Sequence, residues 1–164
     1  MIENKVLYGH RVQSEMPDGF VLEFSSDTFP SIRIRPEGPT DVTIVCYGEM
    51  LREVEDAIIC AFDEHEIICE VICPTMVSPL NLAPILASVT RSHRRLIAEE
   101  GIGCSGFGSE VLARLVETDS MICRRVKRLS SLDHPIPACA SIEREMLPNS
   151  ASIVVALREL MSDE

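Results

Sequence analysis

The segment EEGIGCSGFGSE, residues 99–110, holds the spacing of residues best suited to chemistry in this chain. Gly101, Gly103 and Gly106 match the motif GxGxxG. In dinucleotide-binding folds this motif forms a glycine turn before a helix, and the turn and the helix N-terminus bind the diphosphate. A strand-like run, RRLIA, precedes the segment, and a helix-like run, EVLARLVE, follows it. A dinucleotide site is one interpretation of this pattern, and a glycine turn that shapes a strand-to-helix connection is the other.

The charges around the glycines favour the second interpretation. Glu99 and Glu100 stand at the carboxyl end of the predicted strand, where they would repel an approaching pyrophosphate. The next predicted strand is basic and lacks the acid that dinucleotide folds place about 20 residues after the glycines. Arginines in that strand would suit only a phosphorylated dinucleotide.

In the architectural interpretation each pair of glycines has a structural task. Gly101 and Gly103 permit a sharp exit from the strand, because glycine tolerates backbone angles that other residues avoid. Gly106 and Gly108 let the following helix approach the sheet closely.

The start of that helix offers caps and one nucleophile. Ser105 or Ser109 is expected to cap the helix, and Glu110 in its first turn complements the helix dipole. Cys104, between glycines near the helix start, is a candidate for a thiol of lowered pKa, so a small cysteine enzyme is one hypothesis. A packing role for Cys104 is the alternative.

Other reactive side chains are scattered. Histidines occur at 10, 65, 93 and 134, and His134 in DHPIPA is a candidate to face a neighbouring active site in an assembled complex. RSHRR at 91–95 is either an anion site or a solvated basic strand entry. Seven cysteines without CxxC pairing disfavour zinc and disulfides and indicate a reducing, cytoplasmic compartment.

Composition restricts the classes of function. The 164 residues are 46% hydrophobic and 25% charged, which is typical of one globular domain, and only 4% are aromatic, so the core must be aliphatic. A formal net charge of -11 argues against a nucleic-acid partner and suits a basic protein partner. The polar start predicts no signal peptide, and no apolar run is long enough to span a membrane.

The elements that must position these residues fall into two parts. Residues 1–40 are predicted to form an extended arm and linker, with β-like runs at VLYG, FVLEF and SIRIR and a turn at PDG. From residue 41 to 164, buried strands alternate with helices, which predicts a mostly parallel sheet between helix layers. The predicted strands are DVTIVCY, EIICEVIC, RRLIA and MICRRVKRL.

The predicted helices follow from the spacing of apolar residues. Ser78 and Pro79 are expected to cap and open the helix after the second strand. A short helix at SIEREM and a final helix from about Asn149 complete the pattern. The residues predicted to face inward are Leu51, Val54, Ile58, Ala61, Leu82, Ile85, Leu86, Val89, Val111, Leu112, Leu115, Val116, Ile153, Ala156, Leu157 and Leu160.

Four ordered segments carry a resemblance to a known family. They are DVTIVCYG, EVICPTMVSPLN, IAEEGIGCSGFGSEV and HPIPACASIEREMLPNSASIVVAL. From Asp41 onward the chain resembles the C-terminal domain of the transketolase superfamily, and within it the beta subunit of the thiamine-diphosphate-dependent 2-oxoacid (pyruvate or branched-chain) dehydrogenase decarboxylase component. IENKVLYG resembles the last strand of the family's pyrimidine-binding domain.

The resemblance implies a three-layer α/β/α sandwich with a five-stranded mixed, mostly parallel sheet. It implies that the motif residues Glu99, Glu100, Gly101, Ser105, Gly106, Gly108 and Glu110, with His134, are architectural or lie at interfaces. In the family, thiamine diphosphate and Mg²⁺ are bound between two other domains, one with a GDG motif. No GDG occurs in this sequence, so the chain is expected to bind neither cofactor by itself.

The function expected from these patterns is a non-catalytic module that assembles such an enzyme as a homodimer or with thiamine-diphosphate-binding subunits. The resemblance also implies docking of the small basic subunit-binding domain of an acyltransferase. A stand-alone small-molecule or anion-binding α/β domain is the alternative. An assembly domain should expose an apolar patch, whereas an independent binder need not.

Overall fold

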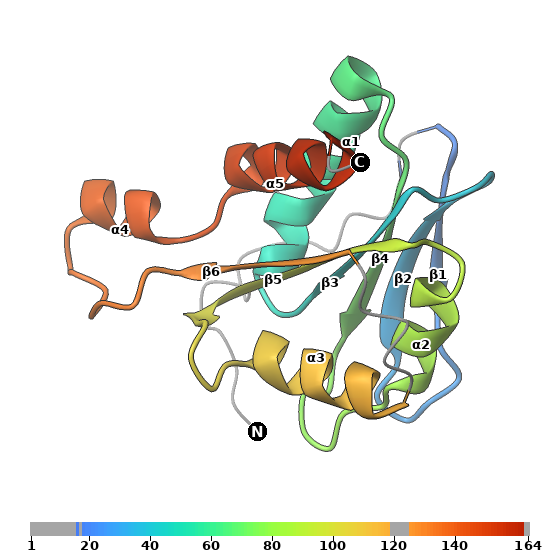
Figure 1. Cartoon of the computed structure of the whole chain (residues 1–164), viewed down its shortest axis with the longest axis horizontal. Coiled ribbons are helices and arrows are strands. Elements are labelled where there is room, and N and C mark those ends of the chain that lie inside the picture. Colours follow the sequence, from blue (N-terminus) through green and yellow to red (C-terminus); the bar gives the residue numbers. More distant parts are fainter. Residues whose placement is uncertain (1–15, 17, 119–124, 163–164) are drawn as a thin grey trace.

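The computed structural model of the chain describes residues 16, 18–118 and 125–162. Its strands are β1 (Phe20–Phe24), β2 (Ser31–Pro36), β3 (Val42–Cys46), β4 (Cys69–Pro74), β5 (Arg94–Ile102) and β6 (Val126–Ser131). Its helices are α1 (Met50–His65), α2 (Ala83–Val89), α3 (Phe107–Thr118), α4 (Ala140–Met146) and α5 (Ser150–Ser162). Figure 1 shows the sheet between α1 and α5 on one side and α2 and α3 on the other, so the predicted three layers are confirmed.

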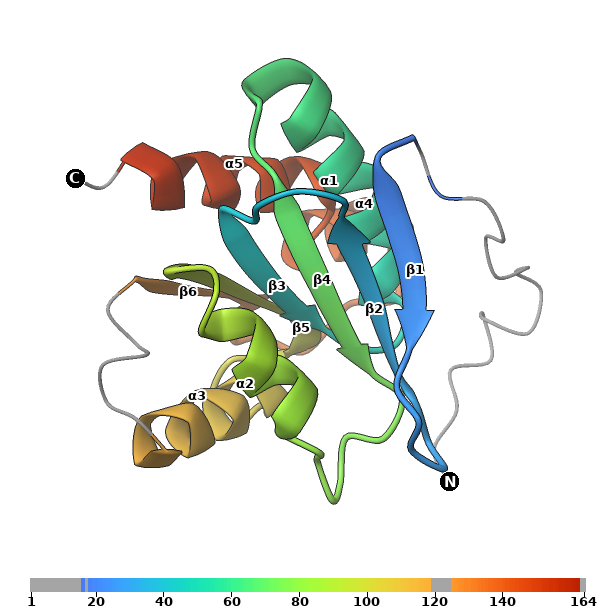
Figure 2. The ribbon, with the colours of Figure 1, turned by 90° about the vertical axis from the view of Figure 1, so that its right-hand side faces the viewer.

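The sheet is mixed and mostly parallel, as predicted. Within the described residues it has six strands in the order β1-β2-β4-β3-β5-β6. The pairs β4–β3, β3–β5 and β5–β6 are parallel, and β1–β2 and β2–β4 are antiparallel. The expected count of five strands is wrong because FVLEF and SIRIR, assigned to the arm, pair into the same sheet (Figure 2).

The position of these two strands bears on the predicted arm. The hairpin that they form turns at residues 25–30, where Ser25 N donates to Ser31 O at 3.0 Å. A hairpin at PDG would need a strand before residue 16, and that part of the arm, VLYG included, lies outside the described residues. The boundary at residue 41 stays a prediction.

Aliphatic side chains fill the core on both faces of the sheet. Since side chains alternate along a strand, Val45 and Ile97 face α2 and α3, whereas Ile44 and Leu96 face α1 and α5. All predicted inward residues of the last helix are buried. Val116 is an error of the periodicity argument: it is 43% exposed on α3.

The predicted start of the helix after β4 is also wrong. Ser78 and Pro79 lie in the connection, and α2 begins at Ala83, whose N–H donates to Asn81 Oδ1 at 3.1 Å. A serine followed by proline resembles a helix start locally, but the polypeptide needs several further residues to travel from β4 to the face that α2 covers. Leu82, expected in the helix, immediately precedes it and is buried.

The C-terminal elements follow the prediction. SIEREM lies in α4, and α5 begins after Asn149, whose side chain accepts from Ser152 N at 3.0 Å as an N-cap. β6 contains the described end of the predicted strand MICRRVKRL, whose residues 121–124 lie outside the described residues. In the part of the chain that the structure describes, no helix is long and apolar enough to cross a membrane.

Candidate functional site

The glycine segment joins β5 to α3 through a buried carboxylate. β5 continues through Gly101 and ends at Ile102, so the predicted strand exit is right for Gly103 and wrong for Gly101. Glu99 is 1% exposed, and its Oε1 accepts the N–H of Gly108, in the first turn of α3, at 3.0 Å. The N-terminus of α3 is therefore capped by the strand that precedes it.

The glycines make room for that carboxylate. A Cβ at Gly106 would lie 2.6 Å from Glu99 Oε2 and 2.5 Å from the Ile102 carbonyl oxygen. A Cβ at Gly108 would lie 2.7 Å from Glu99 Oε1 and 3.0 Å from the Ile97 side chain. The expectation that Gly106 and Gly108 permit close approach of the helix is confirmed.

The serines expected as caps have other roles. Ser109 lies inside α3 and its hydroxyl donates to the Gly103 carbonyl at 2.8 Å, while Ser105 is exposed with a φ of 56°. Arg128 of β6 also binds Gly103 O, at 3.0 Å, and the Ser109 hydroxyl. Glu110 does lie in the first turn of α3, as predicted.

A diphosphate does not fit this connection. The donor that a helix N-terminus would offer a phosphate is directed at the Glu99 carboxylate instead. Burial raises the pKa of Glu99, although the Gly108 N–H partly opposes that shift. The structure thus supports the architectural interpretation of GxGxxG over the dinucleotide interpretation.

The carboxyl ends of the parallel strands carry further acids. Glu100 is half-buried on the opposite face of β5, and burial together with Glu49, Glu143 and Glu53 raises its pKa. Burial and the two glutamates of the EEG motif also raise the pKa of Tyr47. This end of the sheet would repel an anion.

The candidate nucleophile and the candidate histidine both lie exposed on connections between elements. Cys104 is exposed, with Sγ 3.9 Å from the Ser105 hydroxyl, and His134 is exposed in the connection between β6 and α4. Cys139, which the sequence did not single out, is exposed immediately before α4. Hydrogen bonds from the Ser141 hydroxyl and the N–H groups of Ile142 and Ser141 lower its pKa.

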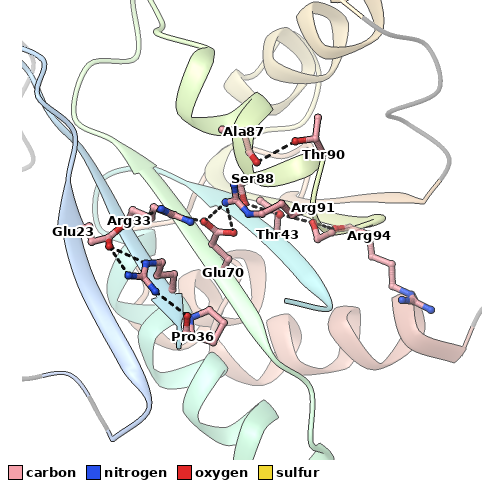
Figure 3. Close-up of polar contacts among 12 residues, drawn as sticks. Glu23, Arg33, Pro36, Thr43, Glu70, Ala87, Ser88, Thr90, Arg91 and Arg94 are labelled. Atoms are coloured by element: carbon pink, nitrogen blue, oxygen red, sulfur yellow. Dashed lines mark hydrogen bonds and ion pairs between the residues drawn. The ribbon is translucent and has the colours of Figure 1, made fainter. Parts of the chain in front are cut away.

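A second polar cluster lies near the amino ends of the parallel strands (Figure 3). Glu70 in β4 is 1% exposed and accepts from Arg91 Nη2 at 2.8 and 2.9 Å. Arg33 of β2 donates Nε to Glu70 and Nη1 to Glu23 at 2.9 Å. Arg35 extends the row by binding the other oxygen of Glu23 at 2.8 Å.

Electrostatics keep this cluster ionised. Burial opposes ionisation of Glu70, but hydrogen bonds from Arg91, Arg33 and Ser88 hold its pKa below the usual value. Beside it, the buried hydroxyls of Thr43 and Ser88 are 2.8 Å apart. We call Glu23, Arg33, Arg35, Glu70 and Arg91 the arginine–glutamate cluster.

RSHRR is therefore only in part a solvated strand entry: Arg91 and His93 are exposed, but the three arginines bind partners in the fold. Arg91 belongs to the cluster, and Arg95 is 3% exposed and donates to the Val89 carbonyl at 2.8 Å. Arg94 donates to Leu160 O at 3.1 Å, near the end of α5. The available signal for the cluster was Glu70 itself, a lone acid inside the apolar run IICEVIC that requires a buried partner.

The described residues do not suit thiamine diphosphate or its metal ion. Among them, no group of three or more His, Cys, Asp or Glu side chains could hold a metal ion. The helix end that could take a diphosphate is occupied by Glu99.

Three exposed apolar side chains follow one another along the chain near the β6 edge of the sheet. Leu132, Ile136 and Ile142 are 53%, 48% and 48% exposed. We call residues 132–142 the apolar arm. Figure 1 shows α4, which the apolar arm enters, projecting beyond β6 and away from the body of the domain.

Three layers, parallel central strands and a carboxylate-capped glycine connection define an α/β domain with a projecting apolar arm. The sequence model of the family described as "Transketolase, C-terminal domain" matches residues 31–153. The chain belongs to this family, and the resemblance predicted from its motifs is confirmed.

The relatives are subunits of larger proteins. The pyruvate dehydrogenase E1 component subunit beta-1, mitochondrial, of Arabidopsis thaliana is 34% identical over 163 residues, which cover 94% of this chain and 42% of the relative. The pyruvate dehydrogenase E1 component subunit beta of Rickettsia felis is 27% identical over 160 residues, covering 97% of this chain and 47% of the relative. The chain thus spans less than half the length of these curated relatives.

Solved structures agree on the fold. A split gene transketolase, an inactive beta4 tetramer, has a TM-score of 0.63 and 20% identity over 76% of this chain and 40% of its own. A 2-oxoglutarate:ferredoxin oxidoreductase from Magnetococcus marinus has a TM-score of 0.54 and 13% identity, covering 96% of this chain and 21% of its own. At these identities the likeness concerns the fold.

Proposed function

We propose that this chain is a non-catalytic assembly domain of a thiamine-diphosphate-dependent enzyme of the 2-oxoacid dehydrogenase or transketolase type. Its partners would be subunits that bind thiamine diphosphate, and within that complex it could also pair with a second copy as a homodimer. Its family and its relatives among pyruvate dehydrogenase beta subunits support this proposal.

The observation that carries the proposal is the apolar arm. Leu132 and Ile136 leave about half of each side chain in water. Single exposed apolar residues are common on protein surfaces, but a projecting segment that carries several is typical of a surface covered by another chain. In this proposal His134, which is exposed in the same segment, faces the partner rather than solvent.

Charge supports a further partner. The net charge of -11 favours docking of a small basic domain, such as the subunit-binding domain of an acyltransferase. The acids clustered near Glu100 concentrate part of that charge at the carboxyl ends of the strands. Neutral salt should weaken this docking more than it weakens contacts made by the apolar arm.

Native mass spectrometry of the protein purified from its own cells tests the proposal. We expect it in complex with polypeptides that carry bound thiamine diphosphate. A lone monomer or homodimer without thiamine would contradict the proposal and favour a stand-alone binding domain.

Two variants assign the contact to the apolar arm. We expect Ile136→Ser combined with Ile142→Ser to abolish the complex, because it removes two exposed apolar side chains that stabilise no core of the isolated chain. Val116→Ser, at a similarly exposed position on α3, is the matched control and should leave the complex intact. If the double change and Val116→Ser affect the complex equally, the apolar arm is not the interface.

A further inference from the structure

The arginine–glutamate cluster borders an open groove that contains no residue of the apolar arm. The groove has a volume of about 550 Å³ and is lined by the cluster together with Pro36, Glu37, Gly38, Pro39 and Thr40. Small-molecule sites commonly have volumes of this order. The groove adjoins β2 and β4, whereas the apolar arm follows β6 at the opposite edge of the sheet.

The two carboxylates that face the arginines already accept hydrogen bonds through both of their oxygens. Glu70 accepts from Arg33, from Arg91 through both oxygens, and from Ser88. Glu23 accepts from Arg33 through one oxygen and from Arg35 through the other. These acids therefore orient the guanidinium groups and leave few oxygen lone pairs for a cationic ligand.

The arginines, in contrast, retain donors. Among the described residues, Arg91 bonds only through Nη2, so its Nε and Nη1 hydrogens are without a protein partner, and its side chain is 48% exposed. Arg33 uses Nε and Nη1, which leaves Nη2. Thr40 adds a hydroxyl for which the described residues likewise provide no partner.

Stability alone does not call for an acid at the buried position of Glu70. An apolar residue of similar size commonly stabilises a buried position as well as an ion pair does, since the pair must lose its water. The buried carboxylate instead fixes two arginine forks at one wall of a groove. Preoriented guanidinium groups are what bidentate recognition of an oxyanion requires.

We propose that this groove binds a small phosphate ester, whose phosphate group is held by Arg33, Arg91 and Thr40. The donors outnumber what the two oxygens of a carboxylate can accept and suit the three terminal oxygens of a phosphate monoester. The groove also has room for an organic group beside Pro36 and Pro39. The exposed carboxylate of Glu37 on the rim disfavours ligands with several phosphates.

Titration of the ¹⁵N-labelled chain with inorganic phosphate and with glycerol 3-phosphate tests this proposal by NMR. We expect saturable shifts in the side-chain Nε–H signals of Arg33 and Arg91 and in the backbone N–H signals of Glu37, Gly38 and Thr40. Glycerol 3-phosphate should bind more tightly than phosphate, and glycerol should not bind. Added sodium chloride should weaken binding, because the contact is ionic.

Two variants and one control decide whether the groove is the site. Arg91→Gln should weaken binding by roughly tenfold or more, about the 1.4 kcal/mol expected of a charge-assisted contact. Gly38→Glu should do the same by placing a carboxylate at the groove without touching the cluster, because a Cβ at Gly38 meets no atom within 4 Å. Arg52→Gln, the loss of an exposed arginine on α1, should change nothing.

The outcomes separate clearly. Absence of saturable shifts, or shifts confined to His93 and Arg94 outside the groove, would overturn the proposal, as would binding by Gly38→Glu at wild-type strength. If Arg91→Gln fails to fold, Gly38→Glu and the wild-type shift map still decide. The result is independent of the assembly proposal, because binding is measured on the isolated chain and the complex by mass spectrometry.

Discussion

Replacing Gly106 by alanine should destabilise the protein strongly, because the methyl group has nowhere to go. Its Cβ would lie 2.5 Å from the Ile102 carbonyl oxygen and 2.6 and 2.9 Å from the two oxygens of Glu99. Glu99 cannot move away without releasing the Gly108 N–H, which it accepts at 3.0 Å. Overpacking a well-packed site costs about 1–3 kcal/mol and a weakened cap adds about 1 kcal/mol, so we expect a loss of about 3 kcal/mol.

Thermal unfolding followed by circular dichroism measures this loss. For a chain of this size about 3 kcal/mol corresponds to a fall in the melting temperature of roughly 6–12 °C. Gly38→Ala is the matched control, since a Cβ there meets no atom within 4 Å, and it should be neutral or stabilising by about 0.5 kcal/mol. If the two variants melt together, the glycines of the EEG segment are not architectural.

A double-mutant cycle locates the clash. Two of the three overlaps at Gly106 involve the Glu99 carboxylate, so Glu99→Ala should remove a large part of the cost of Gly106→Ala. We expect a coupling free energy of about 1–2 kcal/mol, within the range for side chains in contact. Additive effects of the two changes would mean that only the backbone oxygen of Ile102 resists the methyl group.

Three further outcomes are expected. Urea unfolding at pH 7 should show that Glu70→Gln costs about 3 kcal/mol, the lower end of the range for broken buried pairs, because the arginines still reach water. Since the pKa of Glu70 is lowered, its contribution to stability is present above the ordinary value of 4.5 and is lost as pH falls through the lowered pKa. The pKa of Glu100 is raised, so ionisation destabilises the folded state as pH rises from 4.5 through the raised value, and Glu100→Gln should be the more stable protein above that window but not below it. Iodoacetamide followed by peptide mass spectrometry at pH 6 should label Cys139 before Cys104, and Ser141→Ala should slow the labelling of Cys139; preferential labelling of Cys104 would revive the cysteine-enzyme hypothesis.

The local sequence pattern correctly predicted the elements whose apolar side chains are buried by neighbouring elements. VTIVC is a continuous apolar run and forms a fully buried parallel strand, and the apolar spacing of α5 holds at every predicted position. The Ser78–Pro79 signal failed because the length of the connection, and not the local preference, decides where α2 can begin. β5 continues past Ala98 because β6 pairs with Ile102 beyond a register irregularity, which no local pattern reveals.

The partners of the buried charged residues could likewise not be predicted from local sequence. The sequence placed Glu99 at the strand end as a charge that repels phosphate, and only the fold shows that its carboxylate replaces the phosphate at α3. Arg33 and Arg91 reach Glu70 from 37 and 21 residues away, so no motif records their meeting. Charged residues inside apolar strands signal a buried partner but do not identify it.

The two proposed surfaces are kept apart by the architecture. The carboxyl ends of the parallel strands lie together at one end of the sheet. Glu100 and neighbouring acids lie there, and β6 leads from there into the apolar arm. The amino ends of these strands, with Arg91 and Glu70, lie at the opposite end of the sheet. An anion bound there is remote from Glu100 and its neighbouring acids and leaves the apolar arm free, so ligand binding and assembly can occur in the same molecule. Mutual dependence of the two would require a change transmitted through β4 and β5, which are buried on both faces and are the part of the sheet least able to deform.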